Sequence, residues 1–177
     1  METKKIILQE FFVQPRRPFH IRELAQLTKL SHTAVGKNLL ELVKDGFIVL
    51  KKVTPYDKYV ANQASWKFCH SKTSSTIEQI HESGLLEHLE KEFEFPALVL
   101  FGSASKGLDD EKSDIDICII SSLTRLPDLA RYEKKLHRPV SLHIYNLKQW
   151  KDLKVKNPEL VNSICNGIVL SGQLEVV

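Results

Sequence analysis

Cysteine is scarce in this 177-residue chain, and its three cysteines are widely spaced. Cys69, Cys118 and Cys165 form no C-x-x-C pair, so the sequence supports neither a zinc site nor a disulfide framework. Cys118 lies in an apolar run and is expected to be a core residue. A long apolar run and a secretory signal are also missing, so we expect a soluble, cytoplasmic protein without membrane contact.

Three motifs that carry known chemistry are incomplete in this sequence. A phosphate-binding P-loop needs Lys and then Ser or Thr after its second glycine, but Gly107 is followed by Leu108-Asp109. A nucleophile elbow around Ser105 needs glycine at position 103, which is serine. A calcium loop that starts at Asp110 needs glycine at position 115, which is isoleucine. These three classes of site are therefore excluded for this stretch.

Positive charge is concentrated in the first part of the chain. Residues 1–70 carry twelve Lys and Arg against six Asp and Glu, a net charge of +6. Residues 71–177 carry thirteen against sixteen, a net charge of −3. Such a division favours different partners for the two parts. The hydrophobic content of 42% is sufficient for one large domain or two small ones.

The stretch with the clearest chemical content, residues 97–120, holds two short apolar runs. The run over 97–101 predicts a buried strand, which Gly102-Ser103 ends. Asp114 and Asp116 accompany the second run, and residues two apart on a strand project from one face, away from the isoleucines between them. Their backbones are separated by about 6.6 Å at the usual strand rise. Two such carboxylates can therefore converge on one divalent cation.

Acidic pairs at strand ends also occur without a metal, so a structural role for this pair stays open. A strand that ends in Gly-Ser adds backbone N–H groups that can bind phosphate. The combined pattern, G-S-x-x-x-G followed by S-D-x-D, resembles the signature of the DNA-polymerase-β-like nucleotidyltransferase superfamily, in its minimal-nucleotidyltransferase branch. The residues that carry the resemblance are Gly102, Ser103, Gly107, Ser113, Asp114 and Asp116. It covers roughly residues 84–172.

This resemblance implies transfer of a nucleoside monophosphate from an NTP to a hydroxyl on protein, RNA or a small molecule. It implies Mg²⁺, or Mn²⁺, as cofactor, with Asp114 and Asp116 as metal ligands and catalytic residues. It also assigns nucleotide binding to four residues of the turn and the loop, namely Gly102, Ser103, Gly107 and Ser113.

Members of this family carry a third carboxylate on the neighbouring strand, and here that acid is missing. The alternation of residues 140–145 predicts a half-buried strand, which offers Ser141 or His143 at the matching positions. His143 is a candidate general base, because imidazole titrates near neutral pH. An ordinary strand residue with a satisfied hydrogen bond is the alternative for the same histidine.

The first sixty residues predict three helices and a hairpin. Helices are expected over 4–13 and 20–28, and a third begins after Ser31, a good N-cap. Strands over 47–53 and 58–61 flank a proline turn. This order resembles a winged helix-turn-helix domain, which implies base contacts from the third helix and phosphate contacts from the hairpin. The implied DNA-binding residues are His32, Thr33, Lys37, Lys51, Lys52 and Lys58. Dimerisation or protein docking remains open for such a domain.

We therefore expect an α+β protein in three segments. A winged helix-turn-helix domain spans 1–65, a helical connector 66–83, and a small mixed-sheet nucleotidyltransferase-like domain with flanking helices 84–177. The connector should contain a break or a helix start at Ser71–Ser75, and Trp66 and Phe68 should pack the first domain against the rest of the chain. Further helices are expected over 127–136, 147–153 and 158–165, and a last strand over 168–170.

Three functional hypotheses arise from this organisation. The first is an enzyme that uses an NTP, with DNA bound through residues 1–65 and a protein or RNA as acceptor. The second is a transcriptional regulator whose nucleotidyltransferase-like domain binds nucleotide without catalysis. The third is a scaffold in which both folds make only protein contacts. A homodimer is compatible with each of them.

Overall fold

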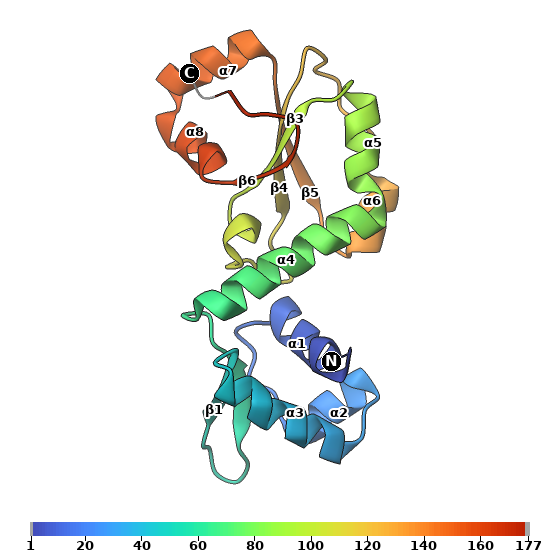
Figure 1. Ribbon diagram of the computed structural model, residues 1–177, viewed down its shortest axis with the longest axis vertical. Coiled ribbons are helices and arrows are strands. Elements are labelled where there is room, and N and C mark those ends of the chain that lie inside the picture. Colours follow the sequence, from blue (N-terminus) through green and yellow to red (C-terminus); the bar gives the residue numbers. More distant parts are fainter. Residues whose placement is uncertain (1, 176–177) are drawn as a thin grey trace. The chain divides into compact units, whose positions relative to one another are not determined.

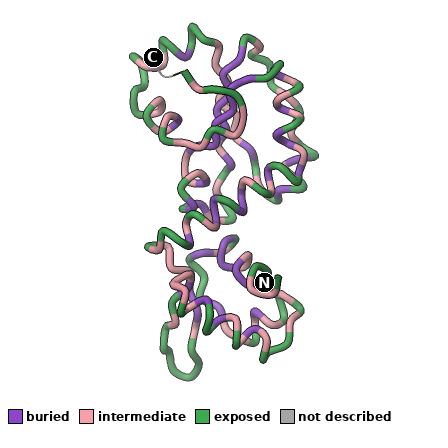
Figure 2. Tube along the Cα trace, viewed as in Figure 1, coloured by how far each residue is buried: buried purple, intermediate pink, exposed green. Residues whose placement is uncertain are grey.

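The computed structural model describes residues 2–175, so residues 1, 176 and 177 of the expected domains lie outside the described part. The chain divides into two compact units, Met1–Lys72 and Thr73–Val177 (Figures 1 and 2). The boundary between them falls within helix α4, Trp66–Ser83. Within residues 2–175, no helix is long and apolar enough to cross a membrane.

Three helices and a hairpin make up the N-terminal unit, in the predicted order. The helices are α1 Glu2–Val13, α2 Ile21–Thr28 and α3 His32–Lys44, and the strands are β1 Ile48–Lys51 and β2 Lys58–Ala61. The two strands pair in antiparallel fashion. Ser31 caps α3 as expected, because its hydroxyl accepts a hydrogen bond from the Ala34 amide at 3.2 Å.

The core of this unit joins all three helices to the hairpin. Its fully buried members include Ile7, Phe11, Leu24, Leu39 and Ile48. Phe19, between α1 and α2, exchanges two backbone hydrogen bonds with Tyr59 of β2, at 2.8 and 2.9 Å. The hairpin is thereby joined by a third extended segment from the chain that precedes α2.

The connector differs from its prediction in two respects. Helix α4 starts at Trp66 and runs without interruption through residues 71–75, so the predicted break or helix start there is wrong. Thr73 is buried, and its hydroxyl donates to the Ala104 and Ser105 carbonyls at 3.3 and 3.4 Å. This polar side chain of the helix therefore has hydrogen-bond partners outside the helix. Trp66 is 67% exposed and does not take the packing role expected of it, whereas Phe68 is fully buried in the core of the N-terminal unit.

The C-terminal unit is a mixed four-stranded sheet with helices on both faces (Figure 1). Its elements after α4 are α5 Leu85–Glu92, β3 Ala97–Phe101, the 3-10 turn η1 Ala104–Lys106, β4 Ile115–Ile120, α6 Ala130–Leu136, β5 Val140–Tyr145, α7 Leu147–Lys156, α8 Pro158–Cys165 and β6 Ile168–Ser171. The strand order is β5-β4-β3-β6, with β4 and β5 parallel and the other neighbours antiparallel. The mixed sheet with flanking helices confirms the expected α+β class.

Helix α6 begins three residues later than the sequence predicted. The Asp128 carboxylate accepts a hydrogen bond from the Ala130 amide at 3.0 Å, and the helix starts at Ala130. This bond gives the first amide of the helix a partner, and the helix begins at Ala130 rather than at Pro127.

Strand β3 forms the buried centre of the sheet, and all five of its residues are buried (Figure 2). On one face, Ile115, Ile117 and Ile119 of β4 pack with the buried residues of α5 and α6. On the other face, Cys118 and Ile120 pack against α7 and α8. The predicted alternation of β4 is confirmed, and it places Asp116 on the α7–α8 side of the sheet.

Cys118 is a core residue, as expected, and this has a measurable consequence. Burial raises the pKa of its thiol to about 12, and the nearby Cys165 contributes to the rise. We expect iodoacetamide at pH 8 to modify at most Cys69 and Cys165 in the folded protein, and all three cysteines in denaturant. Mass spectrometry counts the added groups, and rapid labelling of Cys118 in the folded protein would contradict this burial.

Candidate nucleotide site

The predicted site residues converge where β3 ends and β4 begins. Asp116 lies directly opposite Phe101 of β3 and Ser141 of β5 in the sheet. Asp114 immediately precedes β4 and is exposed, whereas Asp116 is half-buried. The order of the strands therefore brings the acidic pair, the Gly-Ser turn and the predicted strand 140–145 to one end of the sheet.

Gly102 lies directly against the Asp116 carboxylate. Its φ of +70° places it in the left-handed region, and a Cβ built there would overlap Oδ2 of Asp116 and lie 3.2 Å from Cγ. A glycine is therefore needed here for its backbone conformation and for its missing side chain. The backbone of the turn at Gly102 and the Asp116 carboxylate are therefore packed against each other.

The turn after Gly102 is held by a set of backbone and side-chain hydrogen bonds. The Ser103 carbonyl accepts from the amides of Lys106 and Leu108, at 3.2 and 3.0 Å. The Ser105 hydroxyl donates to the Gly102 carbonyl at 3.0 Å. Gly107 ends the 3-10 turn with a φ of +65°. The turn is thus fixed by its own bonds before any ligand binds.

Ser113 makes hydrogen bonds within the loop that precedes β4. Its hydroxyl donates to Asp110 Oδ1 at 3.1 Å and accepts from the Asp110 amide at 3.0 Å. Asp110 Oδ1 also accepts from the Lys112 amide at 3.1 Å. Ser113 therefore closes the 110–113 turn, and any contact with a nucleotide would have to be made in addition to these bonds.

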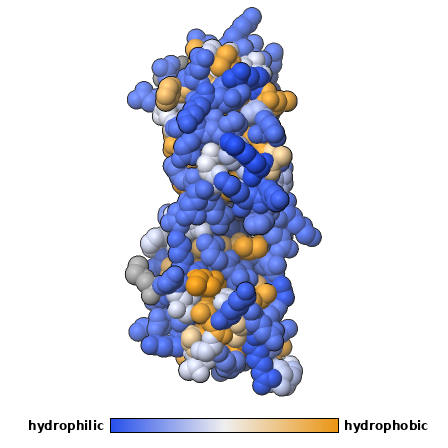
Figure 3. Space-filling view, turned by 90° about the vertical axis from the view of Figure 1, so that its right-hand side faces the viewer, coloured by the Kyte–Doolittle hydropathy of each residue, from blue (hydrophilic) through white to orange (hydrophobic). Residues whose placement is uncertain are grey.

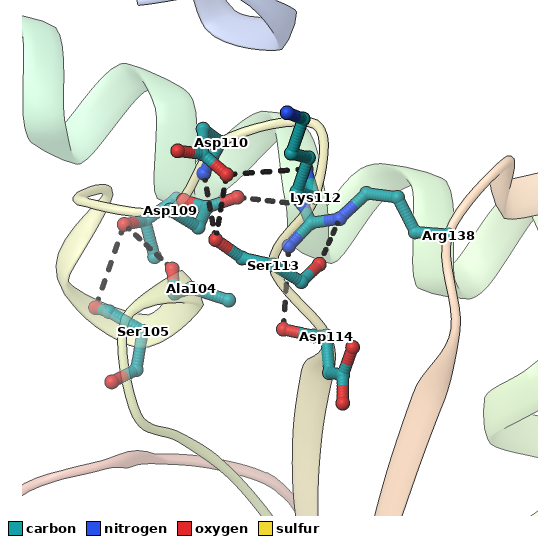
Figure 4. Close-up of polar contacts among 9 residues, drawn as sticks. Ala104, Ser105, Asp109, Asp110, Lys112, Ser113, Asp114 and Arg138 are labelled. Atoms are coloured by element: carbon teal, nitrogen blue, oxygen red, sulfur yellow. Dashed lines mark hydrogen bonds and ion pairs between the residues drawn. The ribbon is translucent and has the colours of Figure 1, made fainter.

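Two site residues were not identified from the sequence, and they form an ion pair. Nη1 of Arg138 lies 2.6 Å from Oδ2 of Asp109, and the two side chains are only 13% and 1% exposed. The same guanidinium donates to the backbone carbonyls of Ser113 at 2.9 Å and Asp114 at 3.3 Å. Figure 4 shows Arg138 reaching across from the segment before β5, while the Asp114 carboxylate points away from it.

The electrostatics of Asp116 favour a cation. Burial raises the pKa of Asp116 above 3.8, the Asp114 charge raises it further, and His143 and Arg138 lower it. Protonation of Asp116 is thus easier in the folded protein than in the unfolded chain, and the stabilising contribution of the neutral form is present below pH 3.8 and lost as the pH rises through the raised pKa. A cation bound beside Asp116 would favour its ionised form.

His143 lies on the same strand as Ser141, next to an aromatic ring. It pairs with Cys118 in the sheet, and its ring meets that of Phe101 edge to face, with centroids 5.0 Å apart. Its Nε2 lies 3.5 Å from the Ser141 hydroxyl. The structure thus brings His143 to the same face of the sheet as Ser141, beside Phe101.

The donors present suit one divalent cation held by two carboxylates. Among residues 2–175, no group of three His, Cys, Asp or Glu side chains is placed to hold a metal ion. Asp114 and Asp116 supply hard oxygen ligands, and Mg²⁺ is commonly held by one or two carboxylates together with substrate phosphates. The raised pKa of Asp116 and its repulsion by Asp114 are consistent with that donor set.

The residues expected to bind DNA lie at two places in the N-terminal unit. His32, Thr33 and Lys37 are exposed on the first turns of α3, and Lys51 pairs with Lys58 across the hairpin. Lys52 comes directly after β1 and is exposed. A groove of about 670 Å³ lies between α2, the start of α3 and the hairpin turn, with walls that include His20, Arg22, Gln26, His32 and Tyr56.

Comparison with known proteins identifies the C-terminal part of the chain. Residues 82–170 match the family described as the nucleotidyltransferase domain. This range contains the turn, both acids and the strand with His143. A comparison with curated proteins found no match.

Proposed function

The chain belongs to the nucleotidyltransferase domain family, and on that premise we propose that its Asp114–Asp116 site binds a Mg²⁺–NTP complex and transfers the NMP to a hydroxyl acceptor, with pyrophosphate as the leaving group. The family supports an NTP as substrate and nucleotidyl transfer as the general reaction. The observation that carries the metal site is the packing of Gly102 against Asp116, beside Asp114 at the start of β4.

Each residue in this proposal has a role that derives from its position. Asp114 and Asp116 would hold the cation, which would supply neutralisation of phosphate charge and activation of the attacking hydroxyl. Ser103 follows Gly102, which packs against Asp116, and in the proposal its hydroxyl and the amides of the turn donate to phosphate oxygens. Gly107 and Ser113 maintain the turn and the loop that carry these groups.

His143 lies on the strand that carries the third acid in this family. In the proposal it accepts the proton of the acceptor hydroxyl, a general-base role that histidine often fills in enzymes. The alternative is a regulator that binds nucleotide without turning it over, in which His143 only packs on Phe101. The two functions differ in one observable, which is transfer of label to an acceptor.

Label transfer tests this proposal. Wild-type protein is incubated with each of the four NTPs, labelled at the α-phosphate, together with Mg²⁺ and a lysate of the source cells. Transfer of label to protein or RNA, abolished by EDTA, is the expected result. Mg²⁺-dependent binding of an NTP without any transfer would instead favour the regulator.

A second function, DNA binding by the N-terminal unit, is favoured by a different observation. Three helices and then a hairpin, with Phe19 paired to Tyr59 as a third extended segment, support the winged helix that we propose for this unit. The groove beside His32 lies between the start of α3 and the hairpin turn, the two parts expected to meet DNA. We therefore propose base contacts from His32, Thr33 and Lys37.

Salt dependence tests the phosphate contacts proposed for the hairpin. Changing Lys51, Lys52 and Lys58 together to alanine should reduce the slope of log affinity against log salt by about 2 to 3, because each lost phosphate contact contributes about 0.9. A fluorescent mixed-sequence duplex serves as the probe. The matched control changes three exposed lysines of α7, Lys148, Lys151 and Lys156, and should leave the slope unchanged.

Protein docking remains the competing role for this unit. On the face drawn in Figure 3, apolar side chains gather over the N-terminal unit, whereas most of the remaining surface is hydrophilic. Leu40 of α3 and Trp66 of α4 are exposed by 64% and 67%. Absence of DNA binding at low salt, together with dimerisation of the chain, would favour docking over DNA recognition.

A further inference from the structure

We propose that Arg138 is a positioning residue that fixes the backbone of the metal ligand Asp114, and that Asp109 holds the Arg138 guanidinium in place. This inference rests on the proposed nucleotide site. It adds a pair of residues that do not belong to the G-S-x-x-x-G or S-D-x-D pattern and that do not touch the substrate in the proposed arrangement.

The Arg138 guanidinium donates in three directions. Its Nε binds the Ser113 carbonyl at 2.9 Å and its Nη2 binds the Asp114 carbonyl at 3.3 Å, so two successive peptide units are held by one planar group. Its Nη1 binds the Asp109 carboxylate at 2.6 Å. The fork shape of arginine allows these three directions at once, and a lysine could not reproduce them.

These bonds lie at the point where the loop enters the sheet. Residues 109–113 lead from the 3-10 turn into β4, and Asp114, at the end of this loop, is exposed. Arg138 precedes β5, and the Ile115 amide donates to the Pro139 carbonyl at 2.9 Å, so the two strand starts are already side by side. Arg138 extends that connection by one residue, from Ile115 to Asp114 (Figure 4).

The ion pair of Arg138 and Asp109 is buried. Asp109 is 1% exposed, and a buried carboxylate needs a partner and hydrogen bonds to remain charged. Arg138 is the positively charged partner of Asp109. Because its Nε, Nη1 and Nη2 all donate to protein groups, its guanidinium binds the loop rather than a phosphate. Its role is therefore to hold the Asp114 backbone so that the carboxylate, which points away from Arg138, faces the site (Figure 4).

The test compares Arg138→Lys and Asp109→Asn with a matched arginine in the same unit. Arg125 lies beyond the other end of β4, and it binds the Glu92 carboxylate at 2.7 Å and the Glu92 carbonyl at 2.9 Å. Arg125→Lys therefore removes a guanidinium that makes similar contacts, but it does so beyond the end of β4 opposite to Asp114. The readouts on the full-length protein are Mn²⁺ affinity, Mg²⁺–NTP affinity and amide hydrogen exchange of residues 109–116.

Arg138→Lys and Asp109→Asn are expected to weaken Mn²⁺ binding by about 10- to 100-fold, the range typical for loss of a group that orients a metal ligand. Hydrogen exchange at residues 109–116 should accelerate in both variants while the rest of the sheet stays protected. Arg125→Lys should change neither. Affinities are compared at a temperature where each variant is fully folded, so loss of stability alone does not move them.

Three results would overturn this inference. Full Mn²⁺ affinity in Arg138→Lys would mean that a positive charge suffices and that the fork plays no part. A loss of NTP affinity with unchanged Mn²⁺ affinity would make Arg138 a phosphate ligand instead. Equal effects of Arg138→Lys and Arg125→Lys on these readouts would mean that the Arg138–Asp109 pair contributes only to the general stability of the protein. Failure of wild-type protein to bind Mn²⁺ or Mg²⁺–NTP would refute the proposed function itself, and is thus distinguishable from all three.

Discussion

Changing both Asp114 and Asp116 to asparagine is expected to lower the affinity for Mg²⁺–NTP by more than about 100-fold, because loss of even an outer-shell partner costs 10- to 100-fold. Both carboxylates lie at the start of β4, where burial and mutual repulsion disfavour the ionised form of Asp116. Asparagine removes the charge and keeps the shape. Affinity is measured as the nucleotide-dependent rise in Tm and by equilibrium dialysis.

The same substitution should not unfold the protein, and this separates binding from stability. An uncharged residue at position 116 removes a carboxylate whose ionisation is disfavoured by burial, so the metal-free variant should be at least as stable as wild type at pH 7. Asp152→Asn, at an exposed position on α7, is the control and should retain affinity. Undiminished nucleotide binding by the double variant would exclude this pair as the site.

Gly102→Ala is expected to have the second largest effect on nucleotide binding. A left-handed backbone costs a non-glycine residue about 1–2 kcal/mol, and a Cβ at this position would also overlap Oδ2 of Asp116. The Asp116 side chain must then move from its place beside the turn. We expect a fall in Mg²⁺–NTP affinity of about 10-fold or more, comparable with loss of an orienting group.

Gly46→Ala provides a matched control for the backbone part of this effect. Gly46 has a φ of +82°, and a Cβ built there would meet no atom within 4 Å. This variant therefore carries the conformational cost without the overlap, and it should lose stability but keep nucleotide affinity. If both variants lose only stability, the contact between Gly102 and Asp116 has no part in binding.

The strands of the site could be predicted because each has a strong local pattern. Ala97–Phe101 is an uninterrupted apolar run and proved to be the buried central strand. The alternation in β4 identified which side chains share a face, and the structure confirms it for the β4 isoleucines, which pack together on one side of the sheet. Period-two patterns report directly on the faces of a sheet, which is why these elements needed no tertiary information.

The Arg138–Asp109 pair could not be found in this way. These residues are 29 positions apart and meet only because β4 and β5 are parallel neighbours with their starts side by side. An isolated arginine before a strand and an aspartate in a polar loop have no distinctive spacing. The register of the sheet, which is a tertiary property, brings them together.

The errors in the connector have a related cause. Residues 71–75 are rich in serine and threonine, which favour turns and helix caps in isolation. In the structure, Thr73 is buried and bonded to the carbonyls of Ala104 and Ser105, a partner set that local propensity does not contain. Trp66 was expected to pack the first domain against the chain that follows, but it is exposed at the start of α4.

Metal-dependent nucleotide binding by the wild-type chain tests the central claim most directly. Equilibrium dialysis of the purified protein against each labelled NTP is carried out with Mg²⁺ and, in parallel, with EDTA. We expect saturable binding of at least one NTP with Mg²⁺, lost with EDTA and lost in the Asp114→Asn/Asp116→Asn variant. Absence of binding for all four nucleotides, or binding that is equal in Mg²⁺ and EDTA, would contradict a Mg²⁺–NTP site at Asp114 and Asp116.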